Sequence, residues 1–113
     1  MHELSITKTM LDLVVEHAQE NGADKVEGIR LVIGEMSGVV DDCVRFYFEF
    51  LSKGTIAEGA RLSFRRVTPK ARCRGCGKEF TLNGLDWICP HCQTTRIDIV
   101  EGKELYLESI EVP

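Results

Sequence analysis

Four cysteines arranged as two C-x-x-C pairs constrain this sequence more than any other feature. The first pair is Cys73 and Cys76, the second is Cys89 and Cys92, and the twelve residues 77–88 separate them. Two such turns can present paired thiolates to one tetrahedral ion, and zinc sites of four thiolates are closed and usually structural. The spacing therefore predicts a zinc ribbon whose metal folds the local chain, and it places any other chemistry elsewhere.

The residues around the cysteines suit such turns. Gly77 directly follows the first pair, where it can take a positive φ and let backbone N–H groups point at a thiolate. Pro90 stiffens the second pair. His91 lies inside the second pair, and we expect it to decorate the surface of the turn.

Length and charge exclude several classes of protein. With 113 residues the chain fits one domain, or one small domain plus a metal-stapled module. Its net charge of −4 argues against a general nucleic-acid binder, which needs a basic surface. No apolar run reaches membrane-spanning length, and the N-terminus lacks the features of a secretory signal. Because four of the five cysteines have metal-binding spacing, we expect a reducing compartment, the cytoplasm.

Hydrophobic periodicity predicts two helices. The first covers residues 4–21 and carries a wide apolar stripe, which suggests burial against a sheet or a second helix. The second runs from Asp41 or Asp42 to Lys53, and an aspartate there is expected to cap the helix. Cys43 falls on its predicted inner face together with Tyr47 and Phe50, so we expect it to be a buried small hydrophobe without a metal.

Strand patterns occur at residues 25–34 and 60–67, and again at residues 97–100 and 105–112. The last two are expected to pair as a hairpin around residues 101–103, with the final strand returning to the main sheet. The predicted fold class is α+β: a short mixed β-sheet with two helices, plus an inserted zinc-ribbon module.

This order divides the chain into two predicted domains. Residues 1–69 and 96–113 form the α/β domain, and residues 70–95 form the zinc ribbon. The ribbon is expected to have a small apolar filling of its own, made of Phe80, Leu82, Leu85, Trp87 and Ile88.

The N-terminus is a candidate ligand set. Methionine aminopeptidases remove Met1 only when the next residue is small, so Met1 should remain ahead of His2. The free α-amine, the His2 amide nitrogen and the His2 imidazole can then close two adjacent chelate rings. An amine and a deprotonated amide favour square-planar or tetragonal geometry, which suits Ni(II) or Cu(II) better than Zn(II). Glu3 can add a carboxylate or can simply lie in the first helical turn.

Several stretches of the sequence together resemble a known family. They are Met1-His2-Glu3 ahead of a helix, Ile33-Gly34-Glu35 followed by Ser37, the run GTIAEG at residues 54–59, and the two C-x-x-C pairs. In this order and spacing, over essentially the whole chain, they resemble the HypA/HybF family of hydrogenase-maturation nickel chaperones. Many zinc ribbons share the cysteine pairs, but their combination with a histidine at position two is specific.

The resemblance implies a nickel site and a zinc site. His2 would be the essential nickel ligand, assisted by the Met1 amine and by the backbone nitrogens of His2 and Glu3. The structural zinc ligands would be Cys73, Cys76, Cys89 and Cys92.

Some members of the family add an acidic ligand at the start of the second helix. In an ungapped comparison that position falls at Val40, which cannot bind a metal. Asp41 or Asp42 can substitute for it, and Asp41 is the candidate retained here. Both aspartates are also explained as helix caps.

The resemblance also implies partners and a role. The partners are a HypB-type GTPase and the hydrogenase large subunit, which receives Ni(II), with urease maturation proteins in some organisms. The chain would act as a monomer or homodimer, with no nucleic acid and no membrane. It has no phosphate-binding loop and no Ser-His-Asp or Cys-His set, so we expect a carrier and not an enzyme.

Two alternatives stay open at this point. The cysteine turns are similar to those of rubredoxin-like electron carriers, although the α/β domain would have no purpose there. The second alternative is a zinc-ribbon module that binds nucleic acid or protein. The basic residues Lys70, Arg72, Arg74 and Lys78 favour it, and the acidic total and the lack of interleaved aromatic residues oppose it.

Overall fold

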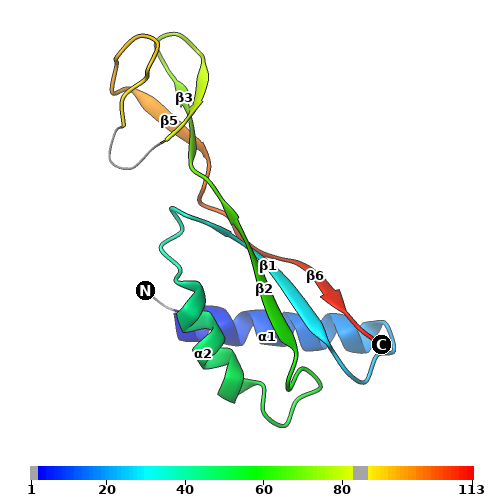
Figure 1. Ribbon diagram of the computed structural model, residues 1–113. Coiled ribbons are helices and arrows are strands. Elements are labelled where there is room, and N and C mark those ends of the chain that lie inside the picture. Colours follow the sequence, from blue (N-terminus) through cyan, green and yellow to red (C-terminus); the bar gives the residue numbers. More distant parts are fainter. Residues whose placement is uncertain (1–2, 83–86) are drawn as a thin grey trace.

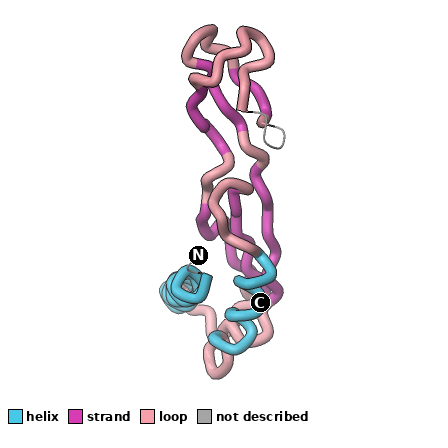
Figure 2. Tube along the Cα trace, turned by 90° about the vertical axis from the view of Figure 1, so that its left-hand side faces the viewer, coloured by secondary structure: helices cyan, strands magenta, loops and turns pink. Residues whose placement is uncertain are grey.

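The computed structural model of the chain describes residues 3–82 and 87–113. The molecule is elongated, 54 × 25 × 17 Å, because two small sheets follow one another along its length (Figure 1). Both helices lie beside one of these sheets, and the described residues around the other sheet form strands, turns and loops (Figure 2). The predicted α+β class is confirmed. Among the described residues no helix is long and apolar enough to cross a membrane.

The helix-bearing part, called the body here, contains a mixed three-stranded sheet. Its central strand β1 (Gly28–Gly34) pairs in parallel with β2 (Arg61–Val67) and antiparallel with β6 (Leu105–Glu111). A central strand is covered on both faces, which explains why β1 reads GIRLVIG with a single exposed residue, Arg30. The predicted return of the last strand to the main sheet is confirmed.

Helices α1 (Glu3–Glu20) and α2 (Asp41–Leu51) cover one face of this sheet. Leu11, Val14 and Ala18 recur at helical spacing along α1 and are buried. They pack with the inward side chains of the central strand to form one core. The predicted apolar stripe on α1, which included Leu4 and Leu13, was wrong at these two positions, because both residues are exposed.

The predicted inner face of α2 was wrong. Cys43 is exposed, and Phe50 keeps 51% of its surface accessible. The buried residues of the helix are Val44 and Phe48. Both faces are apolar in the sequence, so the pattern alone does not choose between them.

A side chain on α2 contacts β2 in a way that agrees with the observed rotation of the helix. The Arg45 guanidinium lies 4.7 Å from the centre of the Phe64 ring and donates a hydrogen bond of 2.8 Å to the carbonyl of Leu62. Both partners belong to β2. Held in this way, the helix presents Phe46 and Tyr47 as a T-shaped aromatic pair away from the core, with Phe46 64% exposed.

The second sheet forms the ribbon. Strand β3 (Lys70–Cys73) lies between β4 (Glu79–Thr81) and β5 (Ile97–Glu101) and pairs antiparallel with both. The predicted hairpin of residues 97–100 with 105–112 was therefore wrong, because these segments belong to different sheets. The division into domains at residues 70 and 95 stays a prediction, and the pairing of β5 with β3 favours a ribbon that extends to Glu101.

The predicted apolar filling of the ribbon was only partly right. Leu82 is buried and Phe80 is half-buried, but Trp87 and Ile88 are 43% and 48% exposed. Leu85 lies outside the described residues. A single layer of three short strands buries little apolar surface. The cysteine cluster must therefore contribute much of the ribbon's stability.

Two chain crossings join the ribbon to the body, and backbone groups meet closely there. The Gly34 N–H donates to the carbonyl of Glu104 at 2.7 Å, and the Met36 N–H donates to the carbonyl of Gly102 at 2.7 Å. Gly102 has φ +116° and lies against Pro69. The absence of side chains at the two glycines permits this approach.

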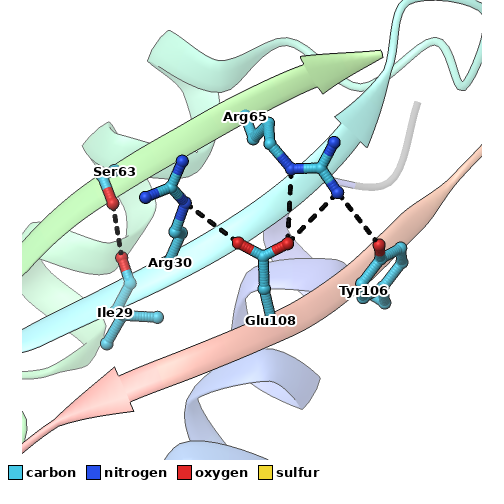
Figure 3. Close-up of polar contacts among 6 residues, drawn as sticks. All are labelled: Ile29, Arg30, Ser63, Arg65, Tyr106 and Glu108. Atoms are coloured by element: carbon cyan, nitrogen blue, oxygen red, sulfur yellow. Dashed lines mark hydrogen bonds and ion pairs between the residues drawn. The ribbon is translucent and has the colours of Figure 1, made fainter.

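The face of the body sheet turned away from the helices carries a charged network (Figure 3). Glu108 on β6 forms an ion pair with Arg30 on β1 at 3.0 Å and accepts a hydrogen bond from Arg65 on β2 at 3.1 Å. Arg65 also donates to the Tyr106 hydroxyl at 3.3 Å. These contacts raise the pKa of Arg65, chiefly through its hydrogen bond with Glu108. One carboxylate thus connects all three strands of the sheet.

Replacing this carboxylate should weaken the body only slightly. We expect Glu108→Gln to lower the free energy of unfolding by about 0.5–1 kcal/mol, since the three side chains are partly solvated. Urea unfolding at low salt and at about 0.5 M salt measures the effect, which should shrink as salt screens the charges. Glu16→Gln, the same change on the exposed face of α1, is the control. A loss that does not depend on salt would contradict an electrostatic origin.

Candidate metal sites

The first cysteine turn begins where β3 ends. The Cys73 N–H donates to the carbonyl of Lys78 at 2.9 Å, and the Gly77 N–H donates back to the carbonyl of Cys73 at 2.9 Å. Gly77 has φ +75°, which confirms the positive φ expected from its place after the pair. The turn therefore points both cysteines of the pair toward the same side.

The second turn repeats this pattern. The Cys89 N–H donates to the carbonyl of Thr94 at 3.0 Å, and the Gln93 N–H donates to the carbonyl of Cys89 at 2.8 Å. Gln93 occupies the position that Gly77 has in the first turn, and its φ is +61°. This left-handed conformation was not predicted from the sequence, because Gln93 is not a glycine. The signal was its position four residues after Cys89, which matches that of Gly77 after Cys73.

The two turns bring the four cysteines together. Their sulfur atoms all lie within 4.8 Å of one another. The Cys73 and Cys92 sulfurs are 3.2 Å apart, and those of Cys76 and Cys89 are 3.7 Å apart. Zinc–sulfur bonds of about 2.3 Å in a tetrahedron place sulfurs about 3.8 Å apart. The donor set therefore fits a tetrahedral Zn(II) ion in both chemistry and spacing.

Backbone N–H groups favour thiolate at this cluster. The N–H groups of Gly75 and Cys76 donate to the Cys73 sulfur at 3.2 and 3.4 Å. Chiefly through the Cys76 N–H, they lower the pKa of Cys73 to about 6. The hydrogen bond to Cys73 raises the pKa of Cys92 to about 12. Without a metal the cluster thus favours a thiolate at Cys73 and a thiol at Cys92, and a divalent cation would favour thiolates at all four.

Of the N-terminal candidates, Met1 and His2 lie outside the described residues. Glu3 is the first residue of α1 and is buried, with 9% of its surface accessible. Its Oε2 accepts a hydrogen bond of 3.3 Å from the N–H of Val40. The Thr7 hydroxyl donates to the Glu3 carbonyl at 2.5 Å. The start of α1 is therefore attached to the segment from which α2 begins (Figure 1).

The aspartates at the start of α2 differ from the prediction. The N-cap residue is Val40, which has no side-chain cap, so the expected aspartate cap was wrong. Asp41 is instead the first helical residue, where its Oδ1 accepts from the Asp42 N–H at 3.0 Å and its Oδ2 lies 3.7 Å from Arg66 Nη1. A nickel-binding role for Asp41 stays a prediction.

Comparison with known proteins identifies the family. The family model described as hydrogenase/urease nickel incorporation, metallochaperone, hypA matches residues 1–112. The chain belongs to the HypA family. Among curated relatives, a hydrogenase maturation factor HypA of Dehalococcoides mccartyi is 48% identical over 99% of this chain and 94% of the relative. One from Caldanaerobacter subterraneus is 43% identical over 99% of each chain.

Solved HypA structures share the fold. A HypA solution structure matches with a TM-score of 0.77 and 30% identity, covering 100% of this chain and 97% of that one. The solution structure of the nickel metallochaperone HypA from Helicobacter pylori matches with a TM-score of 0.70 and 31% identity, over 99% and 97% of the two chains. The resemblance inferred from the motifs is thus confirmed, and the chain shares the role of a hydrogenase-maturation nickel metallochaperone.

One histidine of this chain, His91, lies close to the cysteine cluster. The His91 N–H donates to the Cys89 sulfur at 3.4 Å, and the residue is exposed. Within the described part of the chain, the group able to hold a metal consists of the four cysteines. The expectation that His91 lies at the surface of the turn agrees with its exposure.

Proposed function

We propose that this chain binds Ni(II) at its N-terminus and delivers it to the [NiFe]-hydrogenase large subunit, while Zn(II) at the four cysteines holds the ribbon. The observation that carries the proposal is the family match over residues 1–112, which includes both His2 and the cysteine pairs. The close grouping of the four sulfurs supports the zinc part of the proposal.

For the zinc site, Cys73, Cys76, Cys89 and Cys92 are the proposed ligands. With four protein ligands a zinc ion has no open position, so it supplies folding energy and no catalysis. N–H groups that donate to the Cys73 and Cys89 sulfurs are the outer contacts that typically stabilise bound thiolates.

For the nickel site, the Met1 amine, the His2 imidazole and the backbone nitrogens of His2 and Glu3 are the proposed donors. Amine and amide nitrogens favour the tetragonal geometry of Ni(II). These donors lose protons when they bind, so protonation releases them again. A site of this kind can hold its cargo and still surrender it to an acceptor.

The proposal assigns partners and a place of action. A HypB-type GTPase and the hydrogenase large subunit are the proposed partners, with urease maturation proteins as further candidates. The chain would act in the cytoplasm as a carrier without catalysis of its own. The ribbon surface favours this assignment and disfavours a nucleic-acid-binding module. Two of its arginines are paired with acidic residues, Arg72 with Glu79 at 2.5 Å and Arg74 with Asp98 at 2.6 Å.

A nickel titration of the untagged protein tests the proposal. We expect the wild type to bind about one Ni(II) with a tetragonal-type absorption spectrum, and His2→Ala to lose the site. A variant with one residue added before Met1 should also lose nickel, since the amine becomes an amide. Calorimetry and absorption spectroscopy measure both, with zinc content as an internal control.

His17→Ala is the matched control for the histidine, because His17 is exposed on α1 and pairs with Glu20. It should bind nickel like the wild type. Equal nickel affinity of the wild type, His2→Ala and the extended variant would refute the N-terminal site.

A further inference from the structure

We propose that the Glu3 carboxylate is a positioning group of the nickel site and not a nickel ligand. It holds the start of α1 on the backbone at the start of α2 and so fixes where the N-terminal donors leave the body. The inference rests on the proposed nickel function, and it assigns to the Glu3 side chain a task separate from that of its backbone nitrogen.

The surroundings of Glu3 support an anchor. Glu3 as a residue is only 9% exposed, so its carboxylate needs hydrogen-bond donors, and the N–H of Val40 supplies one at 3.3 Å. Val40 is also the N-cap of α2 and has no side-chain cap of its own. The carboxylate therefore brings negative charge to a helix N-terminus that favours it. Behind Glu3, the fully buried Thr7 holds its carbonyl.

The backbone segment that donates to Glu3 is itself fixed by contacts with the rest of the body. Val39 is buried, and its N–H donates to the Ser37 hydroxyl oxygen at 3.2 Å. Further back in the same loop, the N–H of Met36 donates to the carbonyl of Gly102. Glu3 is thus attached to a loop that is fixed at the core and at the junction with the ribbon.

The benefit to metal binding follows from chain connectivity. Met1 and His2 precede Glu3 directly in the sequence, so a fixed Glu3 shortens the segment that must be ordered when nickel binds. Ordering fewer residues on binding preserves affinity. For this task the side chain needs only an acceptor oxygen, which glutamine also offers, whereas a ligand for Ni(II) needs the carboxylate.

Two substitutions separate an anchor from a ligand. We expect Glu3→Ala to weaken nickel binding about tenfold, because one more residue must be ordered. Glu3→Gln should bind within about twofold of the wild type, because its amide oxygen still accepts from Val40. Untagged proteins are titrated with Ni(II), and Glu16→Ala, which removes an exposed acid from the same helix, should leave the affinity unchanged.

Amide hydrogen exchange of the nickel-free proteins gives a readout independent of nickel. The Val40 amide should exchange faster in Glu3→Ala than in the wild type and should stay protected in Glu3→Gln. If Glu3→Gln binds nickel as weakly as Glu3→Ala, the carboxylate is a ligand and the inference is overturned. Wild-type affinity or unchanged Val40 protection in Glu3→Ala would overturn it as well.

These outcomes differ from a failure of the nickel function. If wild type and His2→Ala bind nickel equally, the N-terminal site itself is refuted, and the inference falls with it. Equal nickel affinities of Glu3→Gln and Glu3→Ala, or unchanged Val40 protection in Glu3→Ala, would overturn the positioning role alone.

Discussion

Cys73→Ser is expected to remove zinc from this chain and to unfold residues 70–101, while the body remains folded. Serine supplies no thiolate, so the site keeps three of its four sulfur ligands. A structural zinc site contributes about 10–16 kcal/mol to folding in small zinc modules. Little else can hold the ribbon, because its buried apolar residues besides the cysteines are Ala71 and Leu82 among those described.

The body should survive because its core does not depend on the ribbon. Its buried cluster runs from Met10 to Leu62 and, within the described ranges, includes no residue between 70 and 101. Its sheet consists of β1 paired with β2 and β6, and none of these three strands belongs to the ribbon. Beside the second crossing to the ribbon, the Met36 N–H donates to the carbonyl of Gly102, and the Gly34 N–H donates to the carbonyl of Glu104.

Zinc content and the amide NMR spectrum measure this result. Cys43→Ser is the matched control, since it makes the same chemical change at the exposed fifth cysteine on α2. It should keep both zinc and fold. Loss of the body signals in Cys73→Ser would show that body and ribbon unfold as one cooperative unit.

Gly34→Ala is the second change with a large expected effect. A Cβ at this position would lie 2.1 Å from the carbonyl oxygen of Gly102 and 2.6 Å from the backbone nitrogen of Glu104. Backbone atoms cannot rotate away as a side chain does, so the end of β1 or the second crossing must shift. Such a shift would weaken the hydrogen bonds from Gly34 to Glu104 and from Met36 to Gly102. We expect a loss of about 3 kcal/mol or more in the free energy of unfolding.

Gly28→Ala provides the control within the same strand. A Cβ there meets the Glu111 side chain at 3.1 Å, and that flexible side chain can move. Urea unfolding followed by circular dichroism should show a clearly smaller loss for Gly28→Ala than for Gly34→Ala. Equal losses would mean that alanine in the strand, and not the contact at the junction, causes the effect.

The parts of the fold that sequence reasoning predicted well depend on local pattern. The cysteine cluster follows from spacing alone, because two short turns bring their own ligands together. The helices and the strands of the body also follow from periodicity, with small differences at their ends. These features need no information about contacts between distant residues.

The parts that it missed depend on such contacts. By residue type Val44 and Phe50 are equally suited to a core, so the face that α2 buries depends on contacts with distant residues, such as those of Arg45 with β2. Residues 97–100 and 105–112 resemble a hairpin around Gly102, but the close approach of Gly102 to Pro69 makes this point a crossing between two sheets. The contact of Glu3 with Val40 likewise joins residues that no local pattern relates.

The strand order β2-β1-β6 has a consequence for how the protein is made. Strand β1 leaves the ribosome early, but its antiparallel neighbour β6 is synthesised only after the entire ribbon. Until then one edge of β1 stays open, and an open strand edge can pair with other chains. The ribbon, whose strands are close in sequence, can meanwhile complete its fold once metal is available. We therefore expect the sheet of the body to be completed only after β6 has been synthesised, whether or not the ribbon has bound zinc by then.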